Sequence, residues 1–136
     1  MYLADTSFLI DLINNYSKAV EKAIKIDNEG VAVAISSITA EEYLRGVYYL
    51  FGDSEDLLAK KLAVAESDLA RFECIALNYQ IARIAARIDA QLTKRGQIIG
   101  LADVLIGATA IQHQLRVITK NIKHFSRIEE IELEEY

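Results

Sequence analysis

The chain has 136 residues, a length typical of one compact domain, and its 52% hydrophobic and 26% charged residues are ordinary for a soluble globular protein. Its formal net charge of −5 argues against a protein that coats DNA or RNA through a basic surface. That charge still allows an enzyme that meets a phosphate through a bound cation. The single cysteine, Cys74, cannot form an internal disulfide. Residues 98–111 are nearly apolar but contain Asp103 and are too short to span a bilayer. We therefore expect a cytoplasmic protein with no membrane partner, made of one domain over residues 1–136.

The first half of the chain alternates between short apolar runs and helix-like stretches. We predict, in chain order, a strand at 2–5, helices at 7–14 and 17–27, a strand at 31–35, and helices at 39–52 and 54–73. The run VAVAI at 31–35 is continuous and rich in valine, as expected of a strand buried on both faces of a parallel sheet. On the 39–52 helix, we expect Leu44, Val47, Tyr48 and Phe51 to face the core, with Tyr43 and Tyr49 at the surface.

The second half continues the alternation. We predict a strand at 74–77, a helix at 79–96, an apolar helix at 101–114, a strand at 115–119, a loop containing Phe125, and a fifth, edge strand at 131–133. Strands that alternate with helices indicate an α/β domain in which a mainly parallel sheet of four to five strands lies between helices. Ligands of such sheets bind beyond the carboxyl ends of the strands. Asp5 and the segment 119–121 lie at such ends.

Several acidic residues have both a structural and a functional interpretation. Asp5 directly precedes a helix and is suited to be its N-cap, but it can equally be half of a metal site. Asp103 lies near the start of an apolar helix, which should draw it inward, although the helix dipole also favours an aspartate there. Spacing alone does not decide between Glu41 and Glu42, and Gly46 leaves room one turn away from Glu42. We interpret Asp11 as a solvated residue or as a supporting partner of the site.

The chain resembles the PIN domain family, and within it the VapC-type toxins of toxin–antitoxin pairs. The matching pieces are, in chain order, Asp5-Thr6-Ser7 after a strand, SITAEEYLRG (37–46), Leu101-Ala102-Asp103 and VITKN (117–121). The match spans nearly the whole chain and implies a PIN-like three-layer α/β/α sandwich. It also implies a ribonuclease that depends on Mg²⁺, with Mn²⁺ as a substitute. The glutamate four residues before the family's glycine is Glu42 here, and this selects it over Glu41.

The resemblance further implies the roles of individual residues. Asp5, Glu42 and Asp103 correspond to acidic metal ligands, and Asn121 stands where relatives often have a fourth acidic residue. His124 stands where relatives often have aspartate. The hydroxyls of Thr6, Ser7 and Thr119 are candidate supporting groups, and Lys120, Lys123 and Arg127 are candidate contacts to the RNA backbone. The implied partners are an RNA substrate, a cognate antitoxin and a second copy of the chain, with YLRGVYYLF (43–51) as a candidate contact surface.

Other functions agree less well with the sequence. A PIN-domain nuclease of RNA processing and a catalytically weak PIN-like binding module both fit the same residues, the second because of Asn121. A receiver-like signalling domain needs a phosphate-accepting aspartate after a central strand, but Ser36 and Ser37 follow VAVAI. A haloacid-dehalogenase phosphatase needs a second aspartate two residues after the first, where Ser7 stands.

Overall fold

Helices and strands alternate along the chain in the computed structural model, which describes residues 1–136. The elements are β1 (Tyr2–Ala4), α1 (Thr6–Ile13), α2 (Ser17–Asn28), β2 (Val33–Ser36), α3 (Ser37–Phe51), α4 (Glu55–Leu69), β3 (Glu73–Ile75), α5 (Tyr79–Lys94), α6 (Leu101–His113), β4 (Arg116–Ile118), α7 (Ile122–Phe125) and β5 (Glu132–Glu134). No helix combines the length and the apolar character that a membrane crossing requires.

The five strands form one sheet in the order β3-β2-β1-β4-β5, and every neighbouring pair is parallel. Ala4, the last residue of β1, is in register with Ile35 of β2 and Ile118 of β4. The residues that follow these three strands therefore emerge at the same edge of the sheet. The predicted α/β class, the parallel sheet and the edge position of the last strand are all confirmed.

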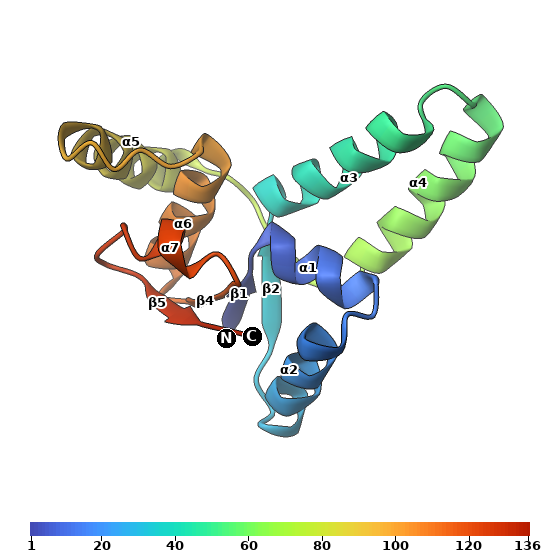
Figure 1. Cartoon of the computed structure of the whole chain (residues 1–136), viewed down its shortest axis with the longest axis horizontal. Helices are drawn as coiled ribbons and strands as arrows, with labels where there is room; N and C mark the ends of the chain where they lie inside the picture. Colours follow the sequence, from blue (N-terminus) through green and yellow to red (C-terminus); the bar gives the residue numbers. More distant parts are fainter.

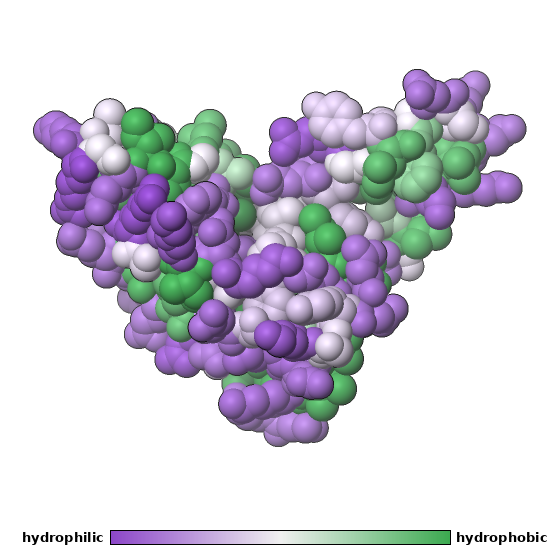
Figure 2. Space-filling view, viewed as in Figure 1, coloured by the Kyte–Doolittle hydropathy of each residue, from purple (hydrophilic) through white to green (hydrophobic).

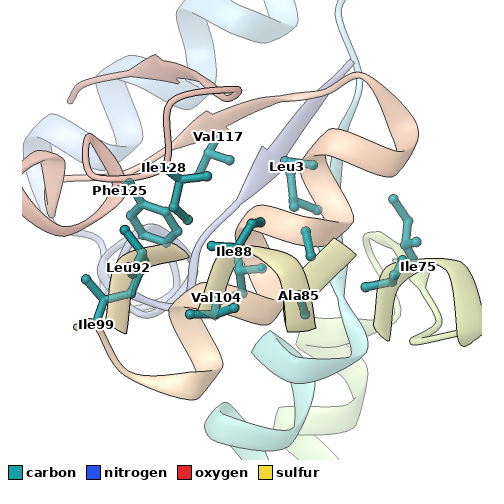
Figure 3. Packing of buried hydrophobic residues seen from close by; sticks show 14 of the residues in the cluster. Leu3, Ile75, Ala85, Ile88, Leu92, Ile99, Val104, Val117, Phe125 and Ile128 are labelled. Atoms are coloured by element: carbon teal, nitrogen blue, oxygen red, sulfur yellow. The ribbon is translucent and has the colours of Figure 1, made fainter. Parts of the chain in front are cut away.

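Alternate residues of the strands pack against helices on opposite faces, which gives three layers. One hydrophobic cluster joins Leu3, Ala34 and Val117 to the apolar sides of α5 and α6. Figure 3 shows residues of this cluster, with Phe125 and Ile128 beside Val117. The other cluster joins Ala4, Ile35 and Ile118 to α1 and α2.

Gly107 in the middle of α6 is one place where a side chain does not fit. A Cβ atom at this position would lie 2.6 Å from Cδ1 of Ile128, so the glycine allows the C-terminal segment to lie close against the helix. This contact helps to hold the segment that follows α7.

The structure corrects several details of the sequence-based prediction. The helix predicted to end at 73 ends at Leu69, and the strand predicted from 31 begins at Val33. Residues 122–125 form a short helix, α7, rather than a loop. On α3, Tyr48 does not face the core, because 54% of it is exposed. Tyr43 is half-buried rather than at the surface, and its hydroxyl donates to Asp68 of α4 at 3.5 Å. The α3–α4 hairpin extends away from the sheet (Figure 1), so Tyr48, near the end of α3, lies beyond the core. Tyr43 lies nearer the sheet and packs against the cluster of α1 and α2.

Candidate active site

Asp5 lies at the end of the central strand and begins the first helix. Its Oδ1 accepts a hydrogen bond of 2.8 Å from the backbone N–H of Phe8, so it is the N-cap of α1. Only 4% of the residue is exposed. The two interpretations of Asp5 are therefore compatible, because the capping carboxylate also lies at the carboxyl end of the sheet.

Two hydroxyl groups hold the Asp5 carboxylate. Thr119, which follows β4 and is fully buried, donates to Oδ2 at 2.5 Å, and Ser7 lies 2.8 and 2.9 Å from the two carboxylate oxygens. Burial raises the pKa of Asp5 above its usual value, and the negative charge of Asp103 adds to this, although the hydrogen bonds to Thr119, Phe8 and Ser7 act in the opposite direction. An ionised Asp5 is thus costly here without a neighbouring positive charge.

Glu42 approaches the site from α3, which begins directly after β2. Its Oε1 accepts a hydrogen bond of 2.6 Å from the hydroxyl of Thr6, the residue next to Asp5. Arg45, one turn further on, lies 3.6 Å from Oε2 and 3.5 Å from Glu41. The space around Gly46 is open, since a Cβ there would meet no atom within 4 Å. The Thr6 bond therefore fixes one oxygen of Glu42 beside Asp5.

Asp103 lies in the first turn of α6 and contacts α7. Its Oδ2 is 3.4 Å from Nδ1 of His124, and the same ring nitrogen is 2.9 Å from Nδ2 of Asn121. One quarter of the Asp103 side chain is exposed, so the carboxylate is only partly drawn inward, contrary to our expectation of a buried one. The backbone N–H of Asn121 donates to Thr119, which links this group to Asp5.

The basic residues predicted to contact RNA differ in their surroundings. Lys120 is bound to Asp11, with 2.7 Å between its Nζ and Oδ2. Arg127 donates to the carbonyl of Ile98, and Lys123 is exposed. Asp11 also accepts a hydrogen bond of 2.8 Å from the hydroxyl of Tyr136, and so acts as a supporting residue.

Comparison with known proteins identifies the family. The PIN domain family profile matches residues 2–131. The chain belongs to the PIN domain family. Ribonuclease VapC1 of Methanocaldococcus jannaschii is 35% identical over 134 residues, which cover 98% of this chain and 85% of that protein. The tRNA(fMet)-specific endonuclease VapC of Salmonella typhimurium is 29% identical over 99% of this chain and 97% of its own length.

Solved structures agree with this assignment. DNA-bound VapBC from Salmonella typhimurium has a chain with a TM-score of 0.82 and 28% identity, covering 98% of this PIN domain and 96% of that chain. VapBC2 from Rickettsia felis, bound to a promoter DNA fragment, has a chain with a TM-score of 0.81 and 27% identity, covering 99% and 98%. The PIN domain described here is thus of the VapC type, and the receiver-like alternative is wrong.

The donor groups of this PIN domain suit a hard divalent cation in their chemistry. Asp5 receives hydrogen bonds from Phe8, Ser7 and Thr119, and a carboxylate has about four lone pairs, so one remains for a ligand. Asp103 supplies a second carboxylate whose charge acts on Asp5. No three histidine, cysteine, aspartate or glutamate side chains lie close enough to surround one cation. Mg²⁺ usually takes only one or two carboxylates and keeps several waters, so two carboxylates suffice.

Sequence reasoning missed three contributors to this PIN-domain site. Thr39 is fully buried beside the cap of α3, 3.5 Å from the Thr6 hydroxyl. Tyr136 reaches back to α1, where its ring contacts Phe8 edge-on and its hydroxyl binds Asp11. His124, named from the sequence only as a departure from the aspartate of relatives, contacts Asp103. Its position three residues after Asn121 could have indicated that it lies beside the site, whereas no local pattern indicated the contact of Tyr136 with Asp11.

Proposed function

We propose that this protein hydrolyses RNA phosphodiester bonds at the acidic end of its sheet, with Mg²⁺ or Mn²⁺ held by Asp5 and Asp103. The chain is an endoribonuclease of the VapC type, as its relatives named ribonuclease VapC and endonuclease VapC indicate. The observation that supports the metal site is the burial of the Asp5 carboxylate at the carboxyl end of β1. Burial raises the pKa of Asp5, and the negative charge of Asp103 raises it further. Two carboxylates in this situation attract a divalent cation, which removes the cost of ionising them.

Each acidic or amide side chain of the site has a separate role in hydrolysis. Asp5 and Asp103 would hold the cation, which would supply Lewis acidity to the scissile phosphate and lower the pKa of a bound water. Glu42 orients the attacking water and accepts its proton as the water oxygen bonds to phosphorus and the bond to the leaving oxygen breaks. Because Thr6 holds Oε1 of Glu42, Oε2 is the oxygen that takes the water, in exchange for its 3.6 Å contact with Arg45. Asn121 offers an amide to a phosphate oxygen or to a water.

The same proposal includes the partners of the enzyme. Lys123 is exposed beside the site and is suited to contact the RNA backbone, whereas Arg127 and Lys120 must exchange their present partners to do so. A cognate antitoxin is supported by the VapBC complexes among the similar structures. An apolar pocket of about 420 Å³, bounded by Phe8, Ile26 and Phe72, is suited to an apolar side chain of such a partner. We place the protein in the cytoplasm as a homodimer.

The direct test is cleavage of RNA by purified protein with and without divalent metal. Asp5→Asn and Asp103→Asn should each lower the cleavage rate about 100-fold or more, because each removes a charge that holds the cation. Glu42→Gln should lower the rate while metal binding, measured by calorimetry, is largely retained.

Asp89→Asn is the matched control, since Asp89 is exposed on α5 and should leave the rate unchanged. Wild-type rates for Asp103→Asn, or full activity after chelation of divalent ions, would contradict the proposal.

A further inference from the structure

His124 introduces a nitrogen atom at the edge of the acidic site. Its Nδ1 lies 2.9 Å from Nδ2 of Asn121 and 3.4 Å from Oδ2 of Asp103, and 44% of its side chain is exposed. These three side chains offer an imidazole, an amide and a carboxylate within one small volume. Such a mixture differs from the two carboxylates of Asp5 and Asp103, which offer oxygen alone.

The three groups are spaced like ligands that share one cation. Nδ1 of His124 lies 2.9 Å from the Asn121 amide and 3.4 Å from Oδ2 of Asp103, and an imidazole nitrogen and a carboxylate oxygen are both metal ligands. Adjacent ligands of an octahedral ion with bonds of 2.1 Å lie about 3.0 Å apart, close to the spacing found here.

The backbone that carries His124 is firmly held, so the arrangement is built into the fold. The next residue, Phe125, is fully buried, and Figure 3 shows it packed beside Ile128 and Val117. On the other side, Thr119 accepts the backbone N–H of Asn121 and donates to Asp5. A cation bound by Asp103 and His124 would therefore lie next to the buried carboxylate of Asp5.

We propose that His124 and Asn121 join Asp103 in holding the cation beside Asp5, and that this nitrogen-containing ligand set makes the enzyme prefer Mn²⁺ to Mg²⁺. The inference rests on the proposed function and adds the choice of metal. Imidazole nitrogen favours first-row transition metals, whereas Mg²⁺ prefers oxygen ligands and water. A half-turn of the Asn121 amide presents its oxygen as a third ligand, and water or an RNA phosphate completes the coordination.

The chain has only two histidines, which makes the test specific. His113 is exposed at the other end of α6, ten residues from Asp103, or about 15 Å along the helix axis. It is too far away to share an ion with Asp103. His113→Gln is therefore a matched control for His124→Gln.

The first measurement is pulsed electron paramagnetic resonance of bound Mn²⁺, which detects a directly coordinated imidazole nitrogen without any substrate. We expect nitrogen coupling in the wild type and in His113→Gln, and none in His124→Gln. Calorimetry should show the Kd for Mn²⁺ rising about tenfold or more in His124→Gln, with little change for Mg²⁺. His124→Asp, which supplies oxygen instead, should reduce the preference for Mn²⁺ over Mg²⁺.

Failure of this inference differs from failure of the proposed function. A wild-type Mn²⁺ spectrum without nitrogen coupling, or equal metal preference in the wild type and His124→Asp, overturns the role of His124. The proposed function still stands in that case if RNA cleavage requires a divalent ion and Asp5. Loss of the metal requirement itself would overturn both.

Discussion

Asp5 shows how one side chain serves the fold and the site together. Its carboxylate caps α1 through Phe8 and simultaneously lies at the carboxyl end of β1, between Ser7 and Thr119. Capping stabilises the helix, whereas burial disfavours the charge. The hydroxyl donors reduce this cost, and a bound cation would remove more of it.

Thr119 is the residue whose hydroxyl contributes most directly to this balance. Thr119→Val keeps the shape but removes the donor to Oδ2 of Asp5 and the acceptor of the Asn121 N–H. We expect a loss of about 2 kcal/mol in the free energy of unfolding, because the buried Asp5 carboxylate loses a donor and the partly buried Asn121 N–H loses its acceptor. The pKa of Asp5 should rise further, since the Thr119 bond is the strongest influence that lowers it. Metal affinity should fall about tenfold.

Urea unfolding and calorimetric metal titration measure the two effects. Thr119→Ser, which retains the hydroxyl, is the control and should keep most of the metal affinity. Unchanged metal binding in Thr119→Val would mean that this hydrogen bond does not position Asp5.

At the residue scale, sequence reasoning found the residues whose position has a local signature. Asp5 follows a strand, and Asp103 stands out in an apolar helix, so both were identifiable from their neighbours. The choice of Glu42 over Glu41 needed the family resemblance. Tyr136 contacts Asp11 across 125 positions of sequence, and a contact of that range leaves no periodic pattern to detect.

At the scale of elements, all five strands and the six longer helices were predicted, and only the shortest helix, α7, was missed. The predicted bounds of α5 and α6 differ from the observed ones by at most two residues. By contrast, α7 has only four residues and depends on the burial of Phe125. A single helical turn is too short to show a period, so tertiary packing determines it.

An ion pair connects the edge strand β5 to helix α2, and its contribution to stability can be measured. Lys22 of α2 lies 2.6 Å from Glu134, and their side chains are only 14% and 25% exposed. The hydrogen bond from Lys22 lowers the pKa of Glu134 below its usual value of 4.5. The ionised carboxylate is thus favoured in the folded state. The stabilisation is fully present above pH 4.5 and is lost as the pH falls through the lowered pKa of the folded state.

We therefore expect Glu134→Gln to reduce the free energy of unfolding by about 1 kcal/mol at neutral pH. The difference from the wild type should shrink as the pH falls below 4.5. Chemical unfolding at a series of pH values measures it. The control is Glu135→Gln, since Glu135 is exposed. A stability difference that stays constant down to acidic pH would contradict the assignment to this carboxylate.

At the scale of the whole molecule, the α3–α4 hairpin exposes several large hydrophobic residues that nothing in the single chain covers. The space-filling view shows a notch between this hairpin and the lobe of α5 and α6, with apolar residues gathered over the hairpin (Figure 2). The large exposed hydrophobic residues of the two helices are Tyr48, Tyr49, Leu50, Leu57 and Val64. A contiguous exposed apolar surface of this kind typically marks a protein–protein contact. The sequence-based expectation of a contact surface at 43–51 therefore applies best to the end of α3 that the core does not cover.

This surface gives the last prediction, which concerns self-association. Leu50 is 77% exposed near the end of α3, so Leu50→Asp should not disturb the core. If α3 forms the homodimer contact, the buried aspartate should raise the dissociation constant of the dimer at least about tenfold, because desolvating an unpaired charge is costly. Light scattering over a range of protein concentrations measures the mass of the wild type and of Leu50→Asp. Ile24→Asp, a change at a 56% exposed position on α2, is the matched control and should leave the mass unchanged. An unaltered dimer in Leu50→Asp, or a wild type that is monomeric throughout, would contradict self-association through this hairpin.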